Sequence, residues 1–127
     1  MPRKAILSPA APQPLSVYSQ AIQSGQLLFL AGQIPLDPVS GEVVSGSITV
    51  ETDRILENLR AVLGAAGASL ADVLKTTIYL TNMADFAEFN AAYGRYFPNE
   101  PPARTTIAVA ALPRGVRIEI EAIASVP

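Results

Sequence analysis

The sequence predicts an α+β fold in which two helices pack on one face of a single mixed β-sheet. Apolar residues recur at helical spacing in two stretches, 55–66 and 86–97, and runs of apolar and β-branched residues lie between turn signals. The predicted order is β-β-α-β-α-β-β, and 127 residues suit one domain spanning 1–127. Since both helices occupy one face of the sheet, the other face must be polar or covered by a neighbour.

The N-terminal part is predicted to be an extended arm followed by a β-hairpin. Residues 1–16 hold four prolines and little periodicity, with room for a short strand near Ala5–Leu7. Residues 17–22 alternate between two faces, and Gln26–Ala31 is a continuous apolar run. Ser24-Gly25 is a turn signal between them, so we expect these two strands to pair.

Both predicted helices carry start and stop signals. Thr49 is the expected N-cap of the first helix, and Gly67 suits its end. Its apolar stripe comprises Ile55, Leu56, Leu59, Val62, Leu63 and Ala66. Asn82 is expected to cap the second helix, with Asp85 at its third position. The apolar face of that helix comprises Phe86, Phe89, Tyr93 and Phe97.

Three more strands are predicted, at Val73–Leu80, Arg104–Leu112 and Val116–Ala124, and the last two are expected to pair around the turn Pro113–Gly115. The face packed on the helices would carry Ile107, Val109, Ile118 and Ile120. The opposite face would carry Arg104, Thr106, Ala108, Glu119 and Glu121. Arg104 and Glu119 would then lie roughly 13 Å apart along the strands. We therefore expect them to line one cleft, or to meet an adjacent subunit, rather than to form an ion pair.

Composition excludes several classes of chemistry. The chain has no Cys and no His, so disulfides, thiolate nucleophiles, Ser-His-Asp triads and the usual zinc sites are ruled out. Acid–base chemistry must come from Asp, Glu, Lys, Tyr, the backbone or water. Nine basic and eleven acidic residues give a net charge of −2, which disfavours nucleic-acid binding.

The distribution of apolar residues bears on location and assembly. The N-terminus lacks a signal peptide, and no apolar run approaches the roughly 20 residues that span a bilayer, so a cytoplasmic location without membrane contact is expected. Only 16% of residues are charged, which predicts apolar surface buried between subunits; a strongly apolar core is the alternative.

Arg104 and Glu119 are the candidate catalytic residues. Arg104 follows a proline-rich segment, and its guanidinium suits bidentate binding of a carboxylate; alternatively it solvates a strand end. Glu119 could orient and deprotonate a water, or it could be one more exposed strand residue. Glu121 competes with Glu119 for the same role.

Several segments resemble the RidA/YjgF family, which is also called the endoribonuclease L-PSP or translation-inhibitor family. The strongest are Pro102-Ala103-Arg104-Thr105-Thr106 through Pro113, and Val116-Arg117-Ile118-Glu119-Ile120-Glu121-Ala122. Ala31-Gly32-Gln33-Ile34-Pro35 resembles the family's glycine–glutamine segment. Leu56–Leu59, Val73–Thr77 and Phe86–Asn90 fit the family's first helix, next strand and second helix, so the similarity covers nearly the whole chain.

The resemblance implies a chorismate-mutase-like fold and a homotrimer whose sheets form a central barrel, with sites in the clefts between subunits. It implies that Arg104 binds the substrate carboxylate and that Glu119 acts on the attacking water. It places Tyr18 and Asn90 in the site, with Gly32 offering its backbone. Pattern alone also allows Tyr18 as an aromatic at the core edge and Asn90 as a solvent-facing residue.

Two substrate-binding positions depart from a common form of the family. Ala31 stands where many members have Ser, and Thr106 stands where many have Cys. A cysteine therefore cannot be an essential nucleophile here, although the backbone at Thr106 can still serve. These departures bear on substrate range more than on the core chemistry.

The function implied by the resemblance is hydrolysis of reactive 2-imino acids to 2-oxo acids and ammonia, with no metal or cofactor. Two alternatives stay open. One is an endoribonuclease that inhibits translation, and the other is a non-catalytic trimer that binds small carboxylates or acts as a chaperone. The expected partners are a small 2-imino or 2-oxo acid and further copies of the chain.

Overall fold

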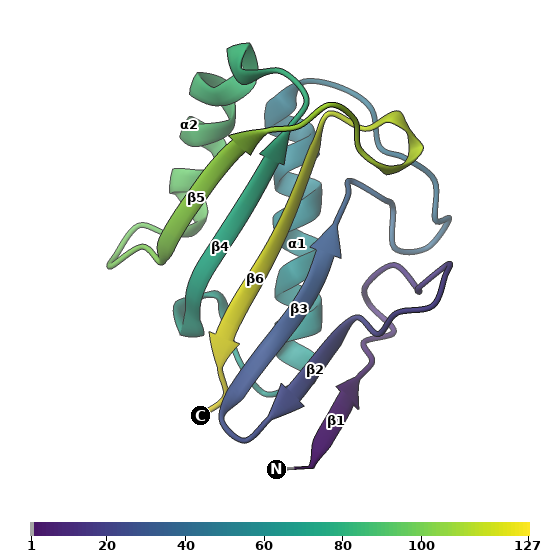
Figure 1. Cartoon of the computed structure of the whole chain (residues 1–127), viewed down its shortest axis with the longest axis vertical. Coiled ribbons are helices and arrows are strands. Elements are labelled where there is room, and N and C mark those ends of the chain that lie inside the picture. Colours follow the sequence, from purple (N-terminus) through teal and green to yellow (C-terminus); the bar gives the residue numbers. More distant parts are fainter. Residues whose placement is uncertain (1) are drawn as a thin grey trace.

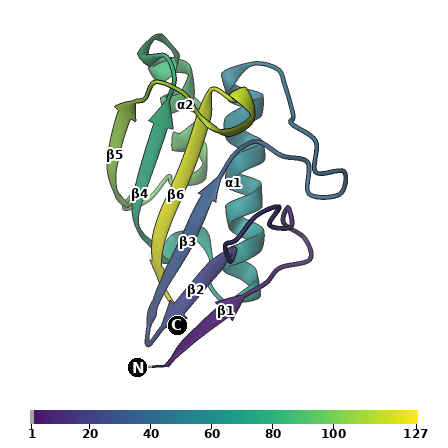
Figure 2. The same ribbon diagram turned by 45° about the vertical axis from the view of Figure 1, so that its right-hand side comes forward.

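The computed structural model describes residues 2–127 as one six-stranded sheet with two long helices on one face. Figures 1 and 2 show helices α1 and α2 side by side behind the sheet, and no helix of residues 2–127 on its other face. The predicted α+β class, the mixed sheet and the placement of both helices on one face are confirmed.

The strands follow the spatial order β1-β2-β3-β6-β4-β5. Their bounds are Arg3–Ile6, Ala21–Ser24, Leu27–Gln33, Val73–Leu80, Ala103–Ala108 and Ile118–Ser125 for β1 to β6. All neighbours pair antiparallel except β4 and β5, which are parallel. The predicted order holds from β2 onward, and β1 adds a third strand ahead of the first helix.

Helix α1 spans Ile48–Ala65 and begins at Ser47, whose side chain accepts a hydrogen bond from the Val50 amide. The predicted N-cap Thr49 is wrong by two residues, because its amide and hydroxyl instead donate to Glu88 of the second helix. At the other end Gly67 adopts a φ of +77° beyond the last turn, as predicted from its position.

Helix α2 spans Phe86–Tyr96 and continues a 3₁₀ turn over Met83–Asp85. Asn82 caps that turn by accepting from the amide of Ala84, which agrees with its predicted role at this helix start. The only change is that the first turn is wound more tightly than an α-helix. Further 3₁₀ turns lie at Leu70–Asp72 and Pro113–Gly115.

The core lies between the sheet and the two helices. It buries the apolar stripe of α1 and the aromatic face of α2 against alternate residues of β3, β4 and β6. The fully buried members include Leu28, Ile55, Leu56, Val62, Leu63, Ile78, Leu80, Phe89, Ile118 and Ile120. The sheet presents these residues on one face because side chains alternate along a strand.

The first predicted strand, residues 17–22, is largely wrong. Strand β2 begins only at Ala21, and Val17 is fully exposed. Gln20 is 1% exposed, and its side chain bonds the amide and carbonyl of Ser8 and the carbonyl of Pro12. These hydrogen bonds hold the proline-rich arm against the rest of the fold. They lie in the segment where the sequence predicted strand pairing.

The predicted C-terminal hairpin is also wrong. Strand β6 does not pair with β5; it inserts between β3 and β4, while β5 pairs with β4 through a helical crossover made by α2. Residues 109–117 cross the end of the sheet between β5 and β6 (Figure 1). A tight turn fixes the register of two strands only when the strands are neighbours in the sheet. The turn at 113–115 joins β5 and β6, which are not neighbours, so it does not indicate how either strand pairs.

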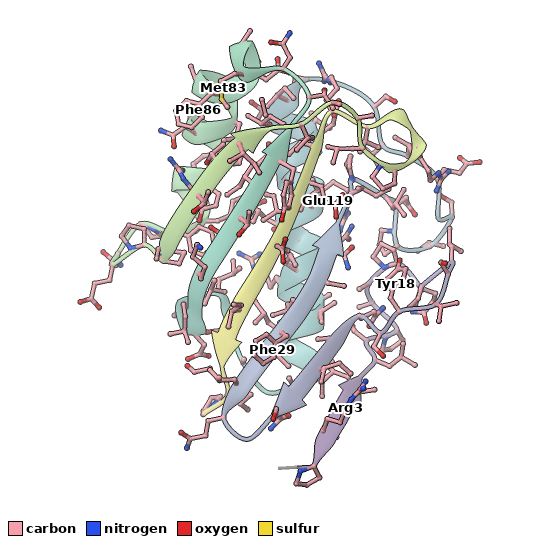
Figure 3. All side chains as sticks on the ribbon, in the orientation of Figure 1. Arg3, Tyr18, Phe29, Met83, Phe86 and Glu119 are labelled. Carbon is pink, nitrogen blue, oxygen red and sulfur yellow. The ribbon has the colours of Figure 1, made fainter. Side chains whose placement is uncertain are left out.

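The face of the sheet opposite the helices is partly apolar. Leu27, Phe29 and Ile107 point to this side and are 43%, 44% and 41% exposed. We call it the open face. Figure 3 shows Phe29 on β3 and Glu119 on β6 directed away from the helices.

Within residues 2–127, none of the helices combines the length and the apolar character needed to cross a membrane.

The bonds of Gln20 make it a test of how the N-terminal arm is held. Replacing it (Gln20→Leu) leaves the Ser8 amide and the Pro12 carbonyl without their partner, so we expect the free energy of unfolding to fall by about 1–3 kcal/mol. Gln23→Leu is the matched control, since Gln23 is only half-buried and its side chain bonds the nearby Gly25 carbonyl. Urea unfolding at fixed protein concentration measures both; equal losses for the two variants would contradict the role given to Gln20.

Candidate functional site

A cleft of about 400 Å³ opens where β3 ends. Three parts of the chain form it: the N-terminal arm, the end of β3 with the residues that follow, and the turn that leads to β6. Its lining comprises Pro12, Leu15, Ser16, Tyr18, Ala31, Gly32, Gln33, Ile34, Leu36, Pro113, Arg114 and Glu119. Most of these side chains are apolar, so the few polar groups determine what chemistry the cleft can support.

Glu119 and Gly32 are in direct contact at the floor of the cleft. A side-chain carbon added to Gly32 would lie 2.0 Å from the Glu119 Oε2 atom, so the carboxyl group would have to move to make room for it. Glycine at position 32 therefore leaves the space that the carboxyl group fills. The register between β3 and β6 also shifts between Leu30 and Gln33, and such irregularities often re-aim backbone groups beside active sites.

The half-buried position of Glu119 changes its acidity. Burial raises the pKa of the Glu119 carboxyl above its usual range, and the negative charge of Glu121 adds to this effect. A raised pKa brings a carboxylate closer to the range in which it can both accept and return a proton.

Arg104 projects from β5 toward the helix side of the sheet, where it meets α2. Its guanidinium donates to the Asn90 side-chain oxygen at 2.7 Å. It also lies over the rings of Phe86, Phe89 and Tyr93, at 5.5, 5.7 and 5.1 Å from their centres. The aromatic rings and the amide hold the guanidinium in one place, while the residue itself stays exposed.

Thr106 lies two residues farther along β5, on the same side as Arg104, and its neighbour on β4 is the buried Ile78. Its Oγ1 atom is buried and has no hydrogen-bond partner among the described residues. A buried hydroxyl without a partner is uncommon and leaves one polar group available to a ligand or a water.

The seven predicted site residues fall into two groups. Tyr18, Ala31, Gly32 and Glu119 line the cleft, and Arg104, Asn90 and Thr106 lie together at β5 and α2. Arg104 is level with Thr76 and Ala122, so its Cα lies roughly 14 Å from that of Glu119, across two strand spacings and three residues.

The two groups also occupy opposite faces of the sheet, which corrects the prediction that Arg104, Thr106, Ala108, Glu119 and Glu121 share one face. Glu119 and Glu121 are on the open face as predicted, but Arg104, Thr106 and Ala108 are level with the buried Thr76, Ile78 and Leu80. Ile107 is accordingly on the open face, and not against the helices. The error followed from pairing β5 with β6.

Two residues near Glu119, Arg114 and Tyr79, were not predicted as functional. Arg114 lines the cleft, and its backbone adopts the left-handed conformation with a φ of 58°. Its guanidinium donates to the Gly41 carbonyl at 2.9 Å. Tyr79, on β4, stands opposite Glu119 and donates to Glu121. The turn sequence around Arg114 could have indicated from the sequence that this residue lies beside the start of β6. The position of Tyr79 could not be predicted in this way, because it depends on β4 being next to β6.

Residues 2–127 contain no cluster of three or more acidic side chains placed to hold a metal ion. The groups that are present suit two other tasks. A fixed guanidinium can bind a carboxylate, and a carboxyl group with a raised pKa can move a proton.

Comparison with known proteins identifies close relatives. A family model described as endoribonuclease L-PSP matches residues 8–126. The chain is 52% identical to protein DfrA of Myxococcus xanthus over 98% of this chain and 96% of that protein. It is 46% identical to a protein of Mus musculus named 2-iminobutanoate/2-iminopropanoate deaminase, over 96% of this chain and 90% of that protein.

Solved structures agree with the fold. The yeast protein YEO7 superposes with a TM-score of 0.96 at 40% identity, covering 99% of this chain and all of that one. TdcF of E. coli, solved with bound serine, gives a TM-score of 0.92 at 37% identity, covering 96% and 98% of the two chains. With a family model spanning nearly its whole length and relatives of this identity, the chain belongs to the endoribonuclease L-PSP family, which is the RidA/YjgF family.

Proposed function

We propose that the protein hydrolyses 2-imino acids to 2-oxo acids and ammonia. The observation that carries this proposal is the Glu119 carboxyl group, which has a raised pKa and lies against the Gly32 backbone in a largely apolar cleft. The name of the mouse relative, 2-iminobutanoate/2-iminopropanoate deaminase, supports the same reaction. The serine bound to TdcF supports a site that accepts a small molecule with a carboxylate.

We further propose that each complete site lies between two copies of the chain in a homotrimer. Arg104 and Glu119 of one chain lie on opposite faces of its sheet, so they cannot act on one small molecule. The open face exposes Leu27, Phe29 and Ile107, which a neighbouring copy would cover. A cyclic arrangement would bring the β5 and α2 surface of one copy to the cleft of the next.

In the proposed first step, Arg104 binds the substrate carboxylate and Glu119 activates a water. The guanidinium is already held by Asn90 and the aromatic rings of α2, so little ordering is needed when the substrate binds. Glu119 takes a proton from the water as the water oxygen attacks the carbon of the protonated imine, and the C=N π electrons move to the nitrogen. The product is a tetrahedral carbinolamine in which that carbon carries both a hydroxyl and an amino group.

In the second step Glu119 returns the proton to the nitrogen, and ammonia leaves as the C–N bond breaks and the C=O bond forms. The proton lost from the hydroxyl is taken up by the same carboxylate or by water. A group with an unperturbed carboxyl pKa would be a weaker base for the first step, so the burial of Glu119 favours the cycle.

The lining of the cleft suggests which imino acids fit. Leu15, Ile34 and Pro113 are among the apolar side chains around Glu119, and Ala31 contributes a methyl group and no hydroxyl. A short aliphatic side chain would lose little on entering such a lining, whereas a charged one would lose its hydration. We therefore expect small to medium aliphatic 2-imino acids to be preferred.

The role of Arg104 is tested by Arg104→Ala. Losing a charge-assisted pair worth about 1.5–3 kcal/mol should lower kcat/KM by roughly 10- to 150-fold. The imine is generated by an amino-acid oxidase and trapped as the semicarbazone. Arg60→Ala is the control, because Arg60 is exposed and pairs with Glu57 on α1. Unchanged hydrolysis in Arg104→Ala would exclude the proposed role, and full, salt-sensitive RNA cleavage by this variant would favour the endoribonuclease alternative.

Sites shared between copies can be tested by mixing two variants that are each impaired in hydrolysis. Arg104→Ala and Glu119→Gln are unfolded together in equal amounts and refolded. In a cyclic trimer three quarters of the random assemblies are mixed, and each contains one intact site, so about a quarter of the wild-type activity should return. Each variant refolded alone is the control. No recovery in mixtures shown by mass spectrometry to contain mixed trimers would rule out shared sites.

The contact between Gly32 and Glu119 is tested by Gly32→Ala. The added methyl group must displace the Glu119 carboxyl, so we expect hydrolysis to fall at least tenfold while circular dichroism and oligomeric state are retained. Gly64→Ala is the matched control, since a methyl group there meets nothing within 4 Å and lies on the exposed side of α1. Wild-type activity in Gly32→Ala would show that the position of the carboxyl is not critical.

A further inference from the structure

Three polar side chains lie together on the open face of the sheet, around the proposed proton acceptor. Glu119 and Glu121 are alternate residues of β6 and point the same way. Tyr79 of β4 is the cross-strand neighbour of Glu119, and Thr77 is that of Glu121. The Tyr79 hydroxyl nevertheless reaches along the strand and donates to the Glu121 carboxylate.

This diagonal hydrogen bond makes the two carboxyl groups unequal. Glu121 is tied to Tyr79, whereas the Glu119 side chain has no hydrogen bond within residues 2–127 and lies on Gly32 in the cleft. Alternate residues on one strand face are roughly 6.6 Å apart, so the charge of Glu121 acts directly on Glu119. The hydrogen bond keeps Glu121 from turning out into solvent, away from Glu119.

We propose that Tyr79 and Glu121 are positioning residues for Glu119: their hydrogen bond fixes a second negative charge beside it and so makes it a better proton acceptor. The effect on catalysis rests on the proposed function. The electrostatic coupling between Glu121 and Glu119 does not depend on that function. Neither residue would touch the substrate. Both would act through the carboxyl group of Glu119.

The other charged or titratable groups around Glu119 are held elsewhere or lie farther away. Arg114 donates to the Gly41 carbonyl, and Arg117, just before β6, is paired with Glu51 of α1. Lys75 of β4 is level with Ile123, two residues beyond Glu121. Tyr18 lines the cleft, and β3 presents no charged side chain to Glu119. Glu121 is therefore the nearest charge fixed on the same face.

The acidities of Glu119 and Tyr79 agree with this geometry. Burial and the charge of Glu121 raise the pKa of Glu119. The hydrogen bond to Glu121, followed by burial and the charges of both glutamates, raises the pKa of Tyr79 to about 12. Tyr79 thus stays a hydrogen-bond donor throughout the range in which Glu119 titrates.

The test is a direct titration of Glu119 in the intact oligomer, using protein labelled with ¹³C at the glutamate carboxyl carbon. Seven glutamates give signals, and Glu119→Gln assigns the one of interest. Glu121→Gln removes the neighbouring charge but preserves the shape. We expect it to lower the pKa of Glu119 by about 0.5–1.5 units. The acid limb of kcat/KM should move to lower pH by the same amount, because Glu119 would then stay ionised at lower pH.

Tyr79→Phe tests the positioning role separately. The charge of Glu121 remains but is no longer held, so the pKa of Glu119 should fall by less than in Glu121→Gln. In the double variant Tyr79→Phe/Glu121→Gln, Glu119 should titrate as it does in Glu121→Gln alone. Once the charge of Glu121 is gone, losing the Tyr79 hydroxyl should have no further effect. Glu42→Gln is the matched control for net charge, since Glu42 is exposed and its side chain takes no part in the cleft; it should leave the titration unchanged.

Two results would overturn the inference. The first is an unchanged titration of Glu119 in Glu121→Gln, and the second is a shift of equal size in Glu42→Gln. Failure of the proposed function is distinguishable, because the titration needs no imine. If imine hydrolysis is absent in the wild type but Glu119 responds to Glu121, the coupling stands and only the reaction is wrong.

Discussion

Strand β6 is held on both edges, by β3 and by β4, and its alternation between the two faces of the sheet determines much of what surrounds it. Ile118, Ile120 and Ala122 are buried against the helices. Glu119 and Glu121 must therefore point to the open face. A carboxylate on the helix side would lose its hydration without compensation, so the packing that builds the core also sets where the acidic groups lie.

The cleft depends on two local features beside that strand. Gly32 has no side chain at the point where the Glu119 carboxyl approaches the backbone of β3. Gln20 anchors the N-terminal arm, which carries Leu15 and Tyr18 into the cleft wall. The missing side chain of Gly32 leaves room for the carboxyl group, and the hydrogen bonds of Gln20 hold the arm that covers it. Together they place Glu119 in largely apolar surroundings. Such surroundings raise the pKa of a carboxyl group.

The single chain keeps its cationic and acidic groups apart. Arg104 is held by α2 on one face of the sheet, and Glu119 lies in the cleft on the other. A direct pair between them would neutralise both groups and make each less available to a substrate. Under the proposed assembly, the groups would meet only where two copies adjoin, with the substrate between them. The partly apolar open face provides a physical reason for such association.

The sequence by itself determined the α+β class, both helices, the strand Val73–Leu80 and the family resemblance, because helical periodicity, caps and motifs are local properties. It also determined that Glu119 and Glu121 share a face, since residues two apart on a strand always do. Only the tertiary structure decided that β6 lies between β3 and β4, and hence that Arg104 and Glu119 are on opposite faces and that Tyr79 reaches Glu121. Strand order depends on contacts between distant segments, and neither alternation nor a turn sequence specifies which edge a strand will join.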